Sequence, residues 1–369
     1  MTMRTKYLPI VPLMIMFMAV SVTEADRGIS VPTEPAAEAL QPRLDEAAPG
    51  QRVTIPAGRY EGDIYITRPN VRIFASQGAQ ILGTVHIEAP EVSLIQVTVI
   101  SDDRCVLVGP SARGFRAYFN RLVVSSPSGV AMEISGTETA GMELFENQIY
   151  NVGGVDPDRD HRGVRHNWKP FRRGSQHPGK GIVVNGTYDG QDPPLRIHRN
   201  RISGLKVGLV LEASDTPAAQ QQPSEPGAEI YRNQITSNAT GIIIRADGCK
   251  IEHNQVRRSS GVGIIATGED TVIHANQILD SERHAIELSS GQVFNNVVAR
   301  NDGGIVAQGA TAVAHNTFYR NEGAMLRVDD SERVSFVNNL VDHTGRLFSG
   351  GEAIERHHNV YANGACPRH

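Results

Sequence analysis

The chain has 369 residues, of which 36 are glycine, 20 are proline and 40% are hydrophobic. That much apolar side chain can build a large core, which excludes wholesale disorder. Thirty-six Lys and Arg residues against 40 Asp and Glu give a formal net charge of -4, so the chain lacks the global basic field that holds duplex nucleic acid. We therefore predict no nucleic-acid partner.

The N-terminus has the features of an export signal. Arg4 and Lys6 precede an apolar run over residues 7–20, and small residues follow where a signal peptidase could cut. The run is shorter than the roughly 20 residues of a membrane anchor, and two prolines interrupt it. We predict a signal peptide over residues 1–25, a flexible leader over 26–37, and a secreted or periplasmic product with no membrane association after cleavage.

The three cysteines are too few and too widely spaced for a disulfide framework. Cys105, Cys249 and Cys366 also lack the spacing of metal ligands. We expect them to be buried small hydrophobic residues.

An internal repeat is the strongest pattern in the chain. It consists of an asparagine, one variable residue and then an apolar residue. From residue 233 onward the interval between repeats is 20 to 22 residues. The repeated asparagines are Asn120, Asn147, Asn200, Asn233, Asn254, Asn276, Asn296, Asn316, Asn338 and Asn359.

Short strands follow the middle asparagines. Residues 241–245, 263–267 and 285–289 each begin with Gly or Ala and alternate apolar side chains, which indicates strand. Three such strands and three turns use about 21 residues, which is one coil of a solenoid. The predicted fold is all-β, a single-stranded parallel β-helix. We expect each asparagine to occupy a left-handed bend and to stack with its equivalents in a ladder.

The pattern resembles the right-handed parallel β-helix of the pectate-lyase-like superfamily, including its asparagine ladder. Residues 38–50 are similar to the short helix that caps the first coil in that family. The resemblance implies a β-helix domain over residues 38–365. Two repeat intervals, 147–200 and 200–233, are longer than the others and indicate insertions at 152–180 and 213–227. The segment 156–160 (Asp-Pro-Asp-Arg-Asp) resembles the Asp-Pro-His-Asp motif of mannuronan C5-epimerases, with aspartate in place of the histidine.

The two insertions interrupt neighbouring coils. One precedes the strand at 181–185 and the other follows the strand at 208–212, and both strands belong to one sheet. Two excursions from the borders of one sheet would wall a cleft across it. Alternation predicts an outward polar column across this sheet, which an ordinary solvated face would also show: Ser135, Asn185, Glu212, Arg245, Thr267, Ser289 and Gln308. A second outward column is largely apolar: Glu133, Val183, Val210, Ile243, Ile265, Glu287 and Val306.

The first insertion is dense in cations and carries the single tryptophan of the chain. Arginine forks pair with carboxylates or sulfates, and an indole can stack on a sugar ring, so we predict an acidic polysaccharide as the partner. The alternative is a solvated charged loop held by its own ion pairs. The candidate substrate-binding residues are His161, His166, Trp168, Arg172 and Arg173.

The chemistry that fits is removal of the C5 proton of a uronate, followed by elimination or by reprotonation from the other face. The chain lacks the Gly-His-Gly of polygalacturonase-like hydrolases and the Arg-x-Pro-x-x-Arg of typical pectate lyases. We predict His177 or Lys180 as the base and Arg245 with Asn185 as the groups that hold the carboxylate. Glu212 could orient a base or bind calcium, and no other cofactor or metal is predicted.

Two other function classes stay open at this point. One is a noncatalytic carbohydrate-binding or surface-adhesion solenoid. The other is a periplasmic accessory factor similar to the copper-site maturation proteins that share this coil, although the chain shows no Cys, Met or His cluster with soft-metal spacing. No feature of the sequence selects one polymer or one oligomeric state.

Overall fold

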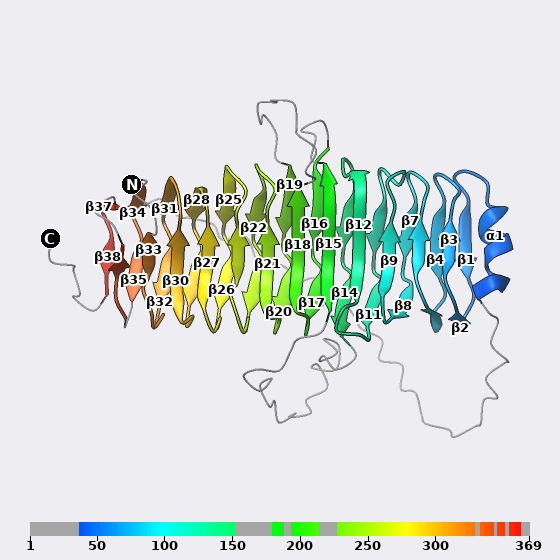
Figure 1. Ribbon diagram of the computed structural model, residues 1–369, viewed down its shortest axis with the longest axis horizontal. Helices are drawn as coiled ribbons and strands as arrows, with labels where there is room; N and C mark the ends of the chain where they lie inside the picture. Colours follow the sequence, from blue (N-terminus) through cyan, green and yellow to red (C-terminus); the bar gives the residue numbers. More distant parts are fainter. Residues whose placement is uncertain are drawn as a thin grey trace, which may run out of the picture. The chain divides into compact units, whose positions relative to one another are not determined.

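The computed structural model describes residues 37–151, 179–187, 193–213, 227–328, 333–342, 345–350 and 354–362. Within the compact unit Glu34–His369, these residues form three parallel sheets, A, B and C, that follow one another in every coil. Figure 1 shows the strands of successive coils side by side in chain order. The predicted signal peptide lies outside the described residues.

Sheet A has 13 strands, each paired in parallel with its equivalent one coil away. Its strands are β1 (Arg52–Ile55), β4 (Arg72–Ala75), β7 (Ser93–Ile95), β10 (Arg116–Tyr118), β13 (Glu143–Phe145), β16 (Leu195–His198), β19 (Ala228–Tyr231), β22 (Lys250–Glu252), β25 (Thr271–His274), β28 (Gly291–Phe294), β31 (Thr311–Ala314), β34 (Val334–Val337) and β37 (Ile354–His357).

Sheet B also has 13 parallel strands and follows sheet A after the turn that carries the repeated asparagine. Its strands are β2 (Gly58–Glu61), β5 (Ala79–Leu82), β8 (Thr98–Ser101), β11 (Arg121–Val124), β14 (Gln148–Asn151), β17 (Arg201–Ser203), β20 (Gln234–Thr236), β23 (Gln255–Arg257), β26 (Gln277–Leu279), β29 (Val297–Ala299), β32 (Thr317–Tyr319), β35 (Leu340–Asp342) and β38 (Val360–Tyr361).

Sheet C has 12 parallel strands and closes each coil. Its strands are β3 (Ile64–Ile66), β6 (Val85–Ile87), β9 (Arg104–Val108), β12 (Val130–Glu138), β15 (Lys180–Thr187), β18 (Val207–Ala213), β21 (Thr240–Ile244), β24 (Ile264–Ala266), β27 (His284–Leu288), β30 (Gly303–Ala307), β33 (Leu326–Val328) and β36 (Phe348–Ser349).

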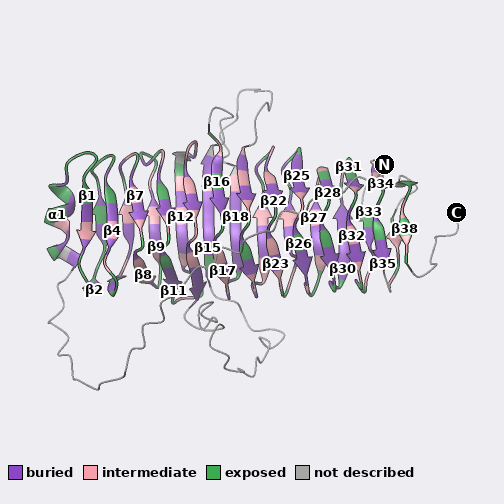
Figure 2. Cartoon of the chain, turned by 180° about the vertical axis from the view of Figure 1, so that it is seen from behind, coloured by how far each residue is buried: buried purple, intermediate pink, exposed green. Residues whose placement is uncertain are grey.

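One hydrophobic core runs through the coils. Inward positions of all three sheets carry Ile, Val and Leu side chains with almost no exposed surface, such as Ile73, Ile149 and Ile286. Buried and more exposed positions alternate along many strands, as period two requires (Figure 2). Each such side chain contributes about 1.5–3 kcal/mol of hydrophobic stabilisation, so every coil adds to the stability of its neighbours.

The predicted asparagine ladder is present, with one correction. In a typical rung, the side-chain amide of Asn254 donates to the backbone oxygen of Ile230 at 2.8 Å and to the side-chain oxygen of Asn276 at 3.0 Å. Ten asparagines take part, but the ninth is Asn339, so the assignment of Asn338 was wrong. Both Asn338 and Asn339 are followed by one residue and then an apolar one, but of the two only Asn339 is buried.

The left-handed bend belongs to the residue before each ladder asparagine, which also corrects the sequence-based expectation. The φ angles of these preceding residues lie between 53° and 59°. The asparagine itself points inward, where its amide satisfies backbone groups that the turn leaves without strand partners. The left-handed residues are Phe119, Glu146, Arg199, Arg232, His253, Ala275, Asn295, His315, Asn338 and His358.

A second, shorter ladder occupies the turn between sheets B and C, and the sequence analysis missed it. The side-chain amide of Asn301 donates to the side-chain oxygen of Asn321 at 3.0 Å and to the backbone oxygen of Ile278 at 3.1 Å. Asn238 lies in the same turn of an earlier coil and accepts from the backbone N–H of Leu205 at 2.8 Å. Two of the three turns of a coil therefore use buried side-chain amides.

The second residue of three neighbouring sheet C strands is a glycine, and there the backbone of one coil approaches the next. A Cβ atom at Gly241 would lie 2.4 Å from the backbone oxygen of Gly263 and 2.6 Å from Cγ1 of Val256. Gly181 and Gly208 occupy equivalent positions in earlier coils. A side chain at these positions has no room without moving the neighbouring coil.

A short helical segment covers the first coil, as the sequence predicted. It consists of the 3-10 helix η1 (Ala37–Ala39) and the helix α1 (Gln41–Asp45), whose Leu44 is buried in the core. The Gln41 side chain donates to the backbone oxygen of Tyr65 at 2.8 Å and accepts from its N–H at 3.0 Å. Backbone groups of the edge strand β3 are thereby satisfied. Within the described residues, no helix has the length and apolarity needed to cross a membrane.

Candidate functional site on the outer face of sheet C

The polar column predicted from the sequence forms on the outer face of sheet C. Asn185 in β15 is in register with Glu212 in β18, and Ser135 in β12 is in register with Asn185. Arg245 follows β21 directly, and its backbone N–H donates to the oxygen of Leu211 at 2.8 Å. Successive coils therefore place Asn185, Glu212 and Arg245 side by side, about 10 Å from the first to the third.

Glu212 and Arg245 form an ion pair at the surface. Their side chains keep 41% and 51% of their exposure, so water still reaches both groups. An exposed pair of this kind contributes at most about 1 kcal/mol. A carboxylate of a ligand can therefore replace or share the Glu212 partner of Arg245 at little energetic cost, because the guanidinium has five donors.

Asn185 contributes a polar atom without a partner. Its side-chain oxygen is shielded from solvent, yet it accepts no hydrogen bond from the part of the chain that the structure describes. Shielded acceptors in native proteins are nearly always paired, so an unpaired one needs an explanation. A ligand that donates a hydroxyl hydrogen would satisfy this oxygen.

Towards the N-terminal coils, the polar surface continues through an ion-paired network. Arg104 in β9 donates to Glu133 in β12, and this hydrogen bond raises the pKa of Arg104. The Ser135 hydroxyl donates to Glu133 at 3.2 Å. Arg104 was not singled out in the sequence, because nothing along the chain shows that it faces Glu133 on the next coil.

The second outward column forms in register, but its centre is covered. Val183 and Val210 are aligned on β15 and β18. With Val207 they form an apolar cluster separate from the main core, and all three are buried. Although they lie on the outer side of the sheet, they present little open surface on which a sugar could stack.

Lys180 and Asn185 lie in the same strand, with Lys180 at its start and Asn185 near its end. Lys180 is the first residue of β15 and is exposed, with Val207 opposite it on β18. Asn185 lies five positions further along the strand, which corresponds to about 16 Å. The structure thus brings Asn185, Glu212 and Arg245 together and places Lys180 at the other border of the sheet.

The remaining predicted site residues lie outside the described residues. They are the candidate base His177 and the candidate substrate-binding residues His161, His166, Trp168, Arg172 and Arg173. Among the residues that the structure does describe, no group of three or more His, Cys, Asp or Glu side chains is arranged to hold a metal ion.

Comparison with known proteins supports the fold. The family model described as "Right handed beta helix region" matches residues 180–344. A search of curated protein sequences found no match. The chain is thus a right-handed parallel β-helix with an asparagine ladder, as its repeat predicted.

Among solved structures, a PL6 alginate lyase in complex with a trisaccharide is 14% identical, with a TM-score of 0.56, and the match covers 87% of this chain and 85% of that one. The alginate lyase AlyF-OU02 with G6 is also 14% identical, with a TM-score of 0.53 and coverage of 92% and 87%. The A-module of the Azotobacter vinelandii mannuronan C-5 epimerase AlgE6 is 12% identical, with a TM-score of 0.50 and coverage of 88% and 95%. At these sequence identities, the similarity shows that the chain shares the β-helix fold of these structures.

Proposed function

We propose that this chain is an exported protein that acts on an acidic, uronate-containing polysaccharide at the outer face of sheet C, as a lyase or a C5-epimerase. One observation carries the proposal: Asn185, Glu212 and Arg245 meet on consecutive coils, and the second insertion follows Glu212 directly along the chain. The lyases and the epimerase that share its fold support the choice of substrate class, since both kinds of enzyme handle a uronate polymer.

Recognition of the substrate would begin with its carboxylate. The Arg245 guanidinium can donate two parallel hydrogen bonds to it, and the unpaired oxygen of Asn185 can accept from a neighbouring hydroxyl. Neutralising the carboxylate also stabilises the negative charge that develops when the C5 proton leaves. In a lyase that charge expels the glycosidic oxygen at C4 and forms a C4–C5 double bond. In an epimerase a proton returns to C5 from the opposite face.

The base that removes the C5 proton is proposed to be His177 or Lys180. Because about 16 Å of strand separates Lys180 from Asn185, Lys180 is better placed for a neighbouring sugar than for the ring that Arg245 would hold. Single alanine variants separate the two roles. We expect the variant of the true base to lose product formation, and the other variant to raise KM with a smaller effect on kcat.

A noncatalytic carbohydrate-binding solenoid is the second candidate function. Within the polar column, Glu212 is the one carboxylate, and it is already paired with Arg245. A site that only binds would need no further base. This alternative predicts retention on an acidic polysaccharide without any change in the polymer.

A panel of polymers tests the proposal directly. Purified protein would be incubated with alginate, pectate, chondroitin and heparin, with ultraviolet absorbance reporting unsaturated products and proton NMR reporting the epimer ratio. We expect one polymer to give an elimination product or an altered epimer ratio. Binding without either change would select the noncatalytic function, and neither binding nor change would refute both.

A further inference from the structure

A second cationic site lies at the turn between sheets A and B, the corner of each coil that faces away from sheet C. A cavity of about 410 Å³ opens there. Its lining, which we call the arginine pocket, includes Phe119, Glu146, Arg199, Arg201, Arg232 and Gln234. Three arginines thus face one carboxylate, although the chain as a whole has a net negative charge.

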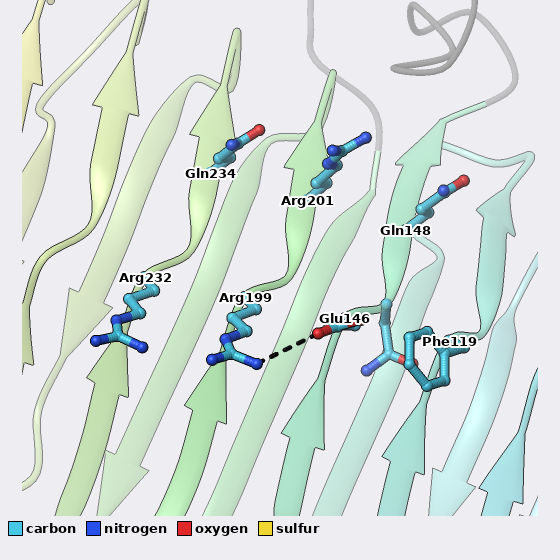
Figure 3. A pocket seen from close by; sticks show the side chains of 8 residues that line it. Phe119, Glu146, Gln148, Arg199, Arg201, Arg232 and Gln234 are labelled. Atoms are coloured by element: carbon cyan, nitrogen blue, oxygen red, sulfur yellow. Dashed lines mark hydrogen bonds and ion pairs between the residues drawn. The ribbon is translucent and has the colours of Figure 1, made fainter. Parts of the chain in front are cut away.

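The arginine side chains come from two adjoining rows. Figure 3 shows Arg232, Arg199 and Glu146 in one row and Gln234, Arg201 and Gln148 in the next. Arg199 and Arg232 are left-handed turn residues of successive coils, so their backbones lie about 4.8 Å apart. The row therefore repeats a cation at the spacing of the coils.

Two of the three arginines, Arg199 and Arg232, are only weakly engaged by the described residues. Arg199 Nη1 lies 3.5 Å from Glu146 Oε1, and the Arg199 side chain is 51% exposed. A pair with that geometry and exposure contributes little, so it yields readily to a ligand. Within the described residues, Arg232 has no ion-pair partner, and it lines the same cavity.

An exposed aromatic ring borders the arginines. Phe119 keeps 53% of its surface exposed, which is unusual for so large an apolar side chain. Its ring is nonetheless held edge-on by Tyr118 at 5.8 Å and Phe145 at 6.1 Å between centroids. An open phenyl face can stack on the apolar face of a sugar. Because neighbouring rings already hold this side chain in place, binding would cost it little conformational entropy.

We propose that the arginine pocket is a second binding site for acidic polysaccharide, distinct from the outer face of sheet C. The arginines would pair with carboxylates, the glutamine amides would bond to hydroxyls, and Phe119 would stack on a sugar ring. A single small anion would leave most of a 410 Å³ cavity unused and would not engage the phenyl face. The proposal rests on the proposed function for the class of polymer, and it adds a site that holds the chain of sugars without reacting with it.

Site-specific footprinting tests the pocket independently of activity. Hydroxyl-radical oxidation of Phe119 would be measured by mass spectrometry with hexaguluronate, hexagalacturonate, neutral cellohexaose and a short oligonucleotide. We expect at least one acidic hexasaccharide to protect Phe119, cellohexaose to give no protection, and added salt to weaken the effect. Protection by the oligonucleotide alone would overturn the assignment to polysaccharide.

A double variant supplies the matched comparison. In Arg199→Asn with Arg232→Asn, the new side chains keep the left-handed turn, because asparagine already occupies the equivalent positions 295 and 338. We expect the acidic hexasaccharide to protect Phe119 only at about tenfold higher concentration or more. Arg300→Asn is the control, since Arg300 has the same φ of 55° as Arg199 and is exposed, but lies at the turn between sheets B and C.

The outcomes separate this site from the one on sheet C. Protection of Phe119 that survives unchanged in the double variant, or that never occurs, would overturn the pocket. Product formation from a uronate polymer without protection of Phe119 would leave the proposed function intact and remove the pocket. Protection of Phe119 without product formation would leave the pocket intact and remove the proposed function.

Discussion

At the scale of single residues, each buried asparagine side chain of the ladder stabilises the fold through several hydrogen bonds at once. A ladder asparagine within the row, such as Asn254, donates to a backbone oxygen and to the next amide, and it accepts from the amide of the previous coil. Removing one side chain therefore leaves several shielded polar groups without partners at once. The cost of such groups exceeds the value of the hydrogen bonds themselves.

Asn254→Ala should lower the free energy of unfolding by about 2–5 kcal/mol, because groups of Asn233, Asn276 and Ile230 all lose a partner. Urea denaturation followed by circular dichroism would measure the loss. The neighbouring Gln255→Ala removes only a hydrogen bond of 3.2 Å at the surface and should cost less than about 1 kcal/mol. Equal effects of the two substitutions would contradict the role assigned to the ladder.

The two described cysteines, Cys105 and Cys249, should be chemically inert in the folded protein. Burial raises the pKa of each thiol to about 12. At pH 8 only about one thiol in ten thousand would then be ionised, and the thiolate is the reactive form. Peptide mapping after iodoacetamide treatment should show both unlabelled in the native protein and labelled in urea. Rapid native labelling of either would contradict their burial.

The raised pKa values of the two thiols predict that the folded protein becomes less stable at alkaline pH. In the unfolded chain a thiol ionises near pH 8.5, whereas these thiols remain neutral in the fold until about pH 12. The stability they contribute is complete below pH 8.5 and is lost as the pH rises from there towards 12. The melting temperature should therefore fall over that range, and Cys105→Ala with Cys249→Ala should weaken the pH dependence.

At the scale of the elements, most of the coil is predictable from the sequence, because the same pattern of asparagine and apolar residues recurs in successive coils. Alternating apolar residues identified the strands of sheet C, and the register of Asn185 with Glu212 follows from the glycine at the second position of both strands. The single error in the ladder, Asn338 for Asn339, arose where two asparagines are adjacent. The left-handed residues were missed because Arg, Glu, His and Phe do not signal a positive φ.

The arginine pocket shows why a site is harder to predict than the coil. Glu146 and Arg199 are 53 residues apart, and Arg199 and Arg232 are 33 apart, because the insertions separate consecutive coils. No local motif links them. Aligning the residue before each ladder asparagine would have shown one aromatic residue, one acid and two arginines in succession.

The glycine column within sheet C gives a test at this scale. Gly241→Ala places a Cβ atom 2.4 Å from a backbone oxygen of the next coil, so the strands must separate. We expect a loss of about 1–3 kcal/mol, measured as a lower melting temperature. Gly109→Ala is the control, because the nearest atom to its Cβ would be 3.4 Å away. A Gly241→Ala protein as stable as the Gly109→Ala protein would show that the coils are not in such close contact.

At the scale of the whole molecule, one coil repeated many times creates long, regular columns of side chains on each face. Such columns are aligned with the coil axis, so a polymer lying along the axis meets a similar group at every step of about 4.8 Å. This geometry explains how one fold can offer a polar column on sheet C and an arginine pocket at another corner. It also means that changes within single coils are enough to create a site.

The central claim is that Arg245 and Asn185 hold a uronate carboxylate for reaction. It is tested most directly by the rate of product formation, followed by NMR, on the polymer that the parent protein converts. Arg245→Ala and Asn185→Ala should each lower kcat/KM by about a hundredfold or more, while Arg300→Asn should retain the parent rate. Variants at 185 and 245 that match the parent, or a parent that converts none of the acidic polymers, would contradict it.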